Sequence, residues 1–318
     1  MRFMERRKIQ LIAGTTYSVS LPKDWINKNK LMKNNEVLIH EKNDGSLSIS
    51  TAFEKKEELK EISIDVDNHA NSIEQILFSV YYLGVQTITL NSKNGLTKEL
   101  KLSIRKALSK MSGSEISYED DNKITIQVFL DKSKVDIIQL LYRISMLTEI
   151  SIEDIFENPD MKEIRINEDE INRLYHLIIK IISLSLTNSS VLNSSNIKNS
   201  LFIPSYSLIG KKMENIGDNI KRLGLYMVNK PNFEHKKEIL LFIKKEINRN
   251  SKYITKNFPE IYEKVNETER KKIKESIQKI KDRTISDYLM EILRYTIDIE
   301  EEIIKISFYK KLISQNIL

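Results

Sequence analysis

The chain has 318 residues, with 51 Lys or Arg against 45 Asp or Glu, which gives a net charge of +6. Its length predicts about two domains, and its 40% of hydrophobic residues excludes a wholly disordered chain. There is no cysteine, which excludes disulfides, zinc–thiolate sites, iron–sulfur clusters and thiol nucleophiles.

The N-terminal segment is basic. Residues 1–33 hold eight Lys or Arg against two acids, a difference that equals the net charge of the whole chain. A concentrated basic segment indicates a polyanionic partner, because phosphate neutralisation releases counterions. The alternative is a solvated basic face that keeps the protein soluble. Charge alone leaves both interpretations open.

Short strands and one helix are predicted in this segment. Residues 8–11 and 16–21 alternate between apolar and polar side chains, which is typical of strands. Pro22 ends the second strand at the first position of a short helix over residues 23–30. A further strand at 37–39 leads to the hairpin signal Asn43-Asp44-Gly45, and Leu47 and Ile49 follow it.

These residues resemble the AbrB/SpoVT-type swapped-hairpin domain, most clearly in Ser20-Leu21-Pro22-Lys23-Asp24-Trp25. The resemblance implies a DNA-binding β-barrel, here residues 1–52, built from two interlocked chains. A dimer is also expected because about fifty residues rarely bury a sufficient core alone. Double-stranded DNA would be contacted by basic residues, with Lys23 and Lys28 on backbone phosphates, and by two hydroxyls; the candidates are Arg6, Arg7, Lys8, Thr15, Thr16, Lys23 and Lys28.

The middle of the chain, residues 58–131, is predicted to be a small α/β domain. Alternating Ile62, Ile64 and Val66 precede a helical pattern that begins at Ile73. Another strand, another helix and two final strands give the order β-α-β-α-β-β, which is typical of a two-layer sandwich.

From residue 132 to 318 the pattern is helical. Gly210, Gly217 and Gly224 recur at heptad spacing beside an apolar stripe. Because glycine costs about 1 kcal/mol in a helix relative to alanine, their alignment indicates a closely packed neighbouring helix. One isoleucine every seven residues, from Ile285 to Ile313, predicts a continuous seam in a helix bundle.

Polar motifs in these helices resemble the PhoU family. They are Asn167 to Tyr175, Glu214-Asn215-Ile216-Gly217-Asp218 and Arg294 to Glu300. An AbrB-like head, a small α/β middle and a PhoU-like bundle together resemble a known archaeal arrangement. The resemblance implies regulation of phosphate uptake or phosphate metabolism, with phosphate-transport or signalling proteins as further partners.

The family resemblance also implies metal binding by paired carboxylates. An i,i+4 spacing places two carboxylates one helical turn apart on the same face, where they can meet one hard cation such as iron, manganese, magnesium or zinc. The sequence departs from the family pattern at Asn172 and Arg294, and Arg294 could pair with Asp298 instead. The candidate ligands are Glu168, Asp169, Glu214, Asp218 and Asp298. The alternative is that these acids only solvate helix surfaces.

Enzyme motifs are absent from the sequence. No Glu-x-x-His pair of a di-iron bundle, no Gly-x-Ser-x-Gly elbow and no glycine-rich phosphate loop occurs. No apolar run approaches the roughly 20 residues of a membrane span, and no signal-peptide core follows the charged N-terminus, so we expect a cytoplasmic protein.

We therefore expect an α+β multidomain protein in which a swapped-hairpin β-barrel, a small α/β sandwich and an all-α helix bundle follow one another. Its expected role is a dimeric, phosphate-responsive transcriptional regulator that is not an enzyme. Two alternatives stay open. One is a PhoU-type adaptor that does not bind DNA and acts on a phosphate transporter or kinase, and the other is an antitoxin-like AbrB protein.

Overall fold

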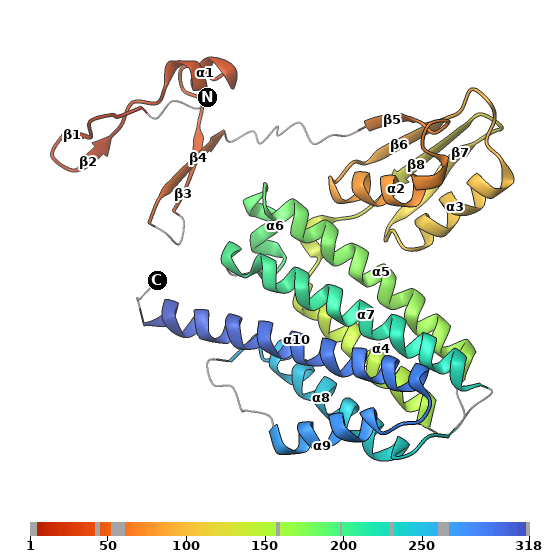
Figure 1. Ribbon diagram of the computed structural model, residues 1–318. Helices are drawn as coiled ribbons and strands as arrows, with labels where there is room; N and C mark the ends of the chain where they lie inside the picture. The colour runs from red at the N-terminus through yellow and green to blue at the C-terminus, as the bar shows by residue number, and fades with distance from the viewer. Residues whose placement is uncertain are drawn as a thin grey trace. The chain divides into compact units, whose positions relative to one another are not determined.

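The chain divides into two units, Met1–Glu58 and Leu59–Leu318, shown in a computed structural model (Figure 1). The structure describes residues 5–41, 45–51, 61–156, 160–197, 199–228, 232–259 and 267–315. The predicted turn residues Asn43 and Asp44 and the predicted helix interruption at Asn158-Pro159 lie outside the described residues.

The N-terminal unit consists of two hairpins and a short helix. Strands β1 (Gln10–Ile12) and β2 (Thr16–Ser18) pair antiparallel, and so do β3 (Val37–Glu41) and β4 (Leu47–Thr51). Helix α1 (Lys23–Lys28) lies between the hairpins in the sequence, and Pro22 is its N-cap residue, one position earlier than predicted.

The predicted barrel is not confirmed. The described strands of this unit form two separate two-stranded sheets, and they do not close into a barrel. Each strand has three to five residues, and an isolated two-stranded hairpin is marginally stable in water. A closed barrel would need strands in addition to the four that are described in this unit.

The second unit begins with the predicted β-α-β-α-β-β order, which is confirmed, and residues 61–128 are called the α/β layer below. Its sheet has the order β5-β6-β8-β7, with β5 parallel to β6 and the other neighbours antiparallel. The elements are β5 (Glu61–Asp65), α2 (Ile73–Tyr82), β6 (Thr87–Asn91), α3 (Lys98–Ser109), β7 (Ser114–Glu119) and β8 (Lys123–Val128).

The sheet of the α/β layer buries one face. Ile88 and Leu90 of β6 and Ile124 and Ile126 of β8 are buried in one core with residues of α2 and α3 such as Leu77. The residues between them on both strands are polar and partly exposed. This alternation is typical of a sheet with helices on one side only.

The rest of the second unit is helical, as predicted (Figure 1). The sequence pattern missed two helices, α6 and α9. The α-helices are α4 (Ile137–Phe156), α5 (Met161–Ser185), α6 (Ser189–Ser194), α7 (Ile203–Met227), α8 (Lys236–Thr255), α9 (Glu267–Gln278) and α10 (Arg283–Ser314). Among the described helices, none combines the length and the apolar run that a membrane crossing requires.

Helix α7 packs against both α5 and α10, and the glycine prediction is confirmed. A Cβ atom at Gly217 would lie 3.1 Å from Ile171 Cδ1, and one at Gly224 would lie 3.1 Å from Met161 Sδ. Both neighbours belong to α5, so the glycines permit the close approach of these helices. On α10, the isoleucines at heptad spacing from Ile285 to Ile306 are buried.

An aromatic cluster joins the α/β layer to α5. The Tyr82 hydroxyl of α2 lies 2.5 Å from His176 Nδ1 of α5. The Phe78 ring stacks on the same imidazole with 3.9 Å between centroids. Beside them, the Lys180 ammonium lies 3.8 Å from the centroid of the Tyr81 ring. These contacts fix the face of α5 that the α/β layer covers.

The buried imidazole makes this junction sensitive to acid. Burial, with smaller effects from Lys110 and Lys211, lowers the pKa of His176 from 6.5 to about 4. Between pH 6.5 and pH 4, His176 is protonated in the unfolded chain but stays neutral in the folded chain. The free energy of unfolding is therefore highest above pH 6.5 and decreases as the pH falls towards 4. The loss amounts to about 3 kcal/mol.

We expect His176→Gln, which does not titrate, to lose less stability than the wild type over this interval. Urea unfolding of both chains at pH 7, 5.5 and 4.5 measures the difference. Parallel pH profiles for the two chains would mean that His176 does not cause the acid sensitivity.

Candidate functional site

All seven predicted DNA-contacting residues are exposed. Three of them, Arg6, Arg7 and Lys8, lie just before β1 and are separated from it by Ile9, and Arg7 pairs with Glu5. Thr15 and Thr16 lie where the β1–β2 turn enters β2. The remaining two, Lys23 and Lys28, are the first and last residues of α1. The cationic side chains are therefore accessible to a phosphate backbone.

The backbone of the β1–β2 turn adopts a left-handed conformation at two residues. Ala13 has φ of 51° and Gly14 has φ of 74°. Glycine adopts this left-handed region without steric cost, and nothing lies within 4 Å of the position of a Cβ atom at Gly14. Thr15 follows at once, so this threonine is presented at an uncrowded loop.

One face of the β1–β2 hairpin is apolar and exposed. Leu11 lies opposite Tyr17 in the register, so both side chains point to the same side of the sheet. Their exposed fractions are 55% and 73%. Ile9, two residues before Leu11, and Val19, two residues after Tyr17, are also exposed.

None of the described residues of the N-terminal unit is buried. Nine large hydrophobic side chains among the described residues of this unit are exposed: Ile9, Leu11, Ile12, Tyr17, Val19, Met32, Leu38, Ile39 and Leu47. Contiguous exposed apolar surface usually marks a contact with another molecule. Within residues 5–41 and 45–51 there is therefore no core that would stabilise this segment as an isolated monomer.

In the second unit, two predicted metal ligands meet between α5 and α7. The carboxyl groups of Glu168 of α5 and Asp218 of α7 lie close enough for each to shift the pKa of the other. Glu214 lies one turn before Asp218, close enough for its charge to raise the pKa of Asp218. Asn172 donates from Nδ2 to Glu168 Oε1 over 2.7 Å. The i,i+4 spacing places Glu214 and Asp218 on one face of α7, and the packing of α5 against α7 brings Glu168 near Asp218.

Each of these carboxylates already has a cation from the chain. Lys221 Nζ lies 2.7 Å from Glu168 Oε2, and Lys211 Nζ lies 2.5 Å from Glu214 Oε2. Arg222 lies 3.6 Å from Asp218. Burial opposes ionisation of Glu168, but the hydrogen bond and the charge of Lys221 outweigh it and lower the pKa of this residue.

Asp218 behaves in the opposite way. Burial, and then the charges of Glu214 and Glu168, raise the pKa of its carboxyl. A protonated Asp218 can donate a hydrogen bond to ionised Glu168, which matches the two opposite shifts. At this contact between α5 and α7, Glu168 is therefore the ionised carboxylate, paired with Lys221, and Asp218 is the carboxyl group that holds a proton more readily.

The other two predicted ligands lie elsewhere. Asp169 is exposed, because one residue turns an α-helix by about 100° away from Glu168. Asp298 of α10 pairs with Lys212 over 2.6 Å, on a side of α7 roughly opposite to Glu214. The predicted pairing of Arg294 with Asp298 is replaced by a contact of 2.5 Å with Glu291.

The predicted ligands fit a metal ion only in part. Within the described ranges, no three or more His, Asp or Glu side chains are grouped so that they could hold one. A metal at Glu168 and Asp218 would have to displace the Lys221 ammonium. Metal binding stays a prediction of the family resemblance, and internal ion pairing accounts for the geometry that is seen.

These opposite pKa shifts give a test of the carboxylate pair. Because the folded pKa of Asp218 is raised, its deprotonation costs stability at neutral pH, and that cost disappears when the pH falls below the unfolded value. We expect Asp218→Asn to unfold at a higher temperature than wild type at pH 7 without added metal. Metal binding predicts the reverse in manganese or iron(II), with stabilisation of the wild type that the variant lacks.

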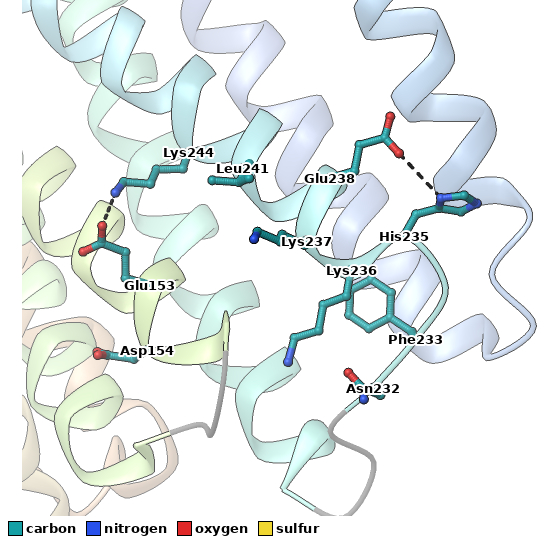
Figure 2. A pocket seen from close by; sticks show the side chains of 10 residues that line it. All are labelled: Glu153, Asp154, Asn232, Phe233, His235, Lys236, Lys237, Glu238, Leu241 and Lys244. Carbon is teal, nitrogen blue, oxygen red and sulfur yellow. Dashed lines mark hydrogen bonds and ion pairs between the residues drawn. The ribbon is translucent and has the colours of Figure 1, made fainter.

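A cavity of about 950 Å³ lies between the end of α4 and the start of α8. Figure 2 shows Lys244 paired with Glu153 on one side and His235 paired with Glu238 on the other. Burial lowers the pKa of Lys236 and raises that of Asp154. Acids and bases are mixed over its wall, so its charge favours neither an anion nor a cation.

Sequence reasoning missed Lys221 and the exposed apolar face of the N-terminal unit. The contacts of Glu214 with Lys211 and of Asp218 with Arg222 have i,i+3 and i,i+4 spacings, which could have been found from the sequence. The pairing of Lys221 with Glu168 joins two helices and has no local signal.

Comparison with protein families, with curated proteins and with solved structures found no match.

Proposed function

We propose that this protein is a phosphate-responsive transcriptional regulator that binds double-stranded DNA as a homodimer through residues 1–52. The observation that carries the proposal is the N-terminal unit, which exposes both its basic residues and its apolar side chains. A second copy of the chain is the partner that would cover the apolar surface. The two copies would then present two equivalent basic surfaces to a two-fold DNA site.

We prefer a second copy of the chain over another protein because every copy exposes the same apolar face on its β1–β2 hairpin. Leu11 and Tyr17 form one half of an apolar layer, and a two-fold partner brings the identical half. The swapped-hairpin resemblance of this segment leads to the same arrangement. The strands of two chains could complete the barrel that one chain does not form.

The helical part is assigned to sensing or to partner binding. Its motifs resemble those of the PhoU family. Its helices share one continuous hydrophobic core, as expected of a rigid domain that binds a ligand or another protein. An antitoxin-like role fits less well, because segments that wrap toxins are usually short and disordered before binding.

Genome-wide mapping of bound DNA with and without phosphate tests the proposal. We expect sites with two-fold symmetry near genes of phosphate transport, with occupancy that changes between the two conditions. The chain with Arg7→Ala and Lys8→Ala serves as the control for DNA contact. If the wild-type chain enriches no sites in either condition, the adaptor alternative takes precedence.

A further inference from the structure

A second cavity, of about 440 Å³, lies between the α/β layer and α5. Its wall combines the turn from α3 to β7 with Arg105 of α3 and Arg173 of α5. The volume is within the range of small-molecule sites, which are mostly apolar with a few polar groups in fixed positions. None of its lining residues belongs to the N-terminal unit or to the carboxylate pair of Glu168 and Asp218.

Two guanidinium groups give the cavity its charge. Arg105 Nη2 lies 2.7 Å from Glu119 Oε2, which leaves other N–H donors of its planar fork for a ligand. Arg173 makes no ion pair with any residue that the structure describes. Among the lining residues only Glu115 is acidic, so two cations face one anion.

A buried hydroxyl adds a neutral donor. Ser114 lines the cavity and is only 9% exposed, and its Oγ has no hydrogen-bond partner within the described part of the chain. Leaving a buried polar group unpaired costs free energy, so a ligand acceptor at this position would be stabilising. Ser114 follows Gly113, whose φ of 73° turns the chain into β7.

The two sides of the cavity are held in place. Arg173 lies three residues before His176, and the imidazole is fixed by Tyr82 and Phe78 of the α/β layer. On the other side, a Cβ atom at Gly113 would lie 3.3 Å from the Phe129 carbonyl oxygen, which favours glycine in this tight turn. The two arginines are therefore presented by packed elements, although they lie 68 positions apart in the sequence.

We propose that this cavity binds a phosphoryl group, with the arginines and Ser114 as its donors. Arginine matches the geometry of phosphate oxygens and forms strong charge-assisted hydrogen bonds with them. The apolar part of the wall, Leu108, Met111 and Ile116, offers room for the organic part of a phosphate monoester. A bound ligand would join the α/β layer to α5. The binding site itself does not depend on the proposed function. Only the link between its ligand and a response to phosphate rests on the proposed function.

Calorimetry of the full chain without DNA tests the site, with glycerol phosphate and inorganic phosphate as separate probes. We expect binding that Arg173→Gln weakens by about tenfold or more and Ser114→Ala by a smaller factor. Arg165→Gln, also exposed on α5, is the matched control and should bind as the wild type does. Circular dichroism checks that each variant is folded.

Tighter binding of glycerol phosphate assigns the site to phosphate monoesters, and tighter binding of inorganic phosphate assigns it to the free ion. Failure of both probes to bind the wild type would overturn the proposal. Equal affinity in the wild type and Arg173→Gln would do so as well. Because no DNA is present, either failure leaves the test of DNA binding unaffected.

Discussion

A chain in which Leu11 and Tyr17 are both replaced by glutamate is expected to be monomeric at micromolar concentration, whereas we expect the wild type to be dimeric. The two side chains form an exposed cross-strand pair, and the proposed dimer would bury four such side chains. Full burial of an exposed apolar side chain contributes about 1.5–3 kcal/mol, so these partly exposed side chains would together contribute roughly 4–8 kcal/mol. This is comparable to the roughly 8 kcal/mol that corresponds to micromolar affinity.

Light scattering of the full chain measures the effect. Leu102→Glu with Leu186→Glu is the matched control, because these leucines are 66% and 67% exposed in the second unit. The control should remain dimeric. A dimeric Leu11→Glu, Tyr17→Glu chain would show that the copies associate through another surface, and a monomeric wild type would exclude the swapped-hairpin arrangement.

Replacing Arg7 and Lys8 together by alanine is expected to weaken DNA binding by about 100-fold at low salt. In the proposed dimer, two cations in each of two chains would make up to four phosphate contacts. Each contact contributes about 0.9 to the slope of log affinity against log salt, so the slope should fall by up to about 3.6. The dimer should stay intact, because exposed substitutions usually change stability by less than about 0.5 kcal/mol.

Fluorescence anisotropy with a labelled duplex over a salt series measures both quantities. Lys271→Ala with Lys274→Ala removes the same charge from exposed positions of α9 and controls for net charge. A base-reading role for Arg7 or Lys8 would appear as relaxed sequence preference. Unchanged affinity and slope in the Arg7, Lys8 variant would mean that the basic segment is only a solvated face.

Elements with a strong apolar period were predictable from the sequence, and weakly patterned ones were not. Gly217 and its heptad neighbours indicated the close approach of a neighbouring helix, because a line of glycines on one face of a helix is visible in the sequence of that helix alone. Helix α6 has six residues, and α9 buries only Ile273 and Ile277. Too few apolar positions mark these helices for a period to be recognised.

The candidate site was predictable within one helix and not between helices. The spacing of Glu214 and Asp218 placed both acids on one side of α7, as the structure has them. No sequence signal connects Lys221 with Glu168, which is 53 positions away, because such a contact depends on how α5 and α7 pack. The barrel has the same limitation, since its missing strands would belong to another chain.

Sedimentation of the full chain with a duplex carrying one two-fold site tests the central claim most directly. We predict a complex of two chains per duplex at low salt, which dissociates as the salt concentration rises because phosphate contacts dominate the affinity. Separate sedimentation of protein and duplex at low salt, or a complex with a single chain, would contradict dimeric DNA binding by the N-terminal unit.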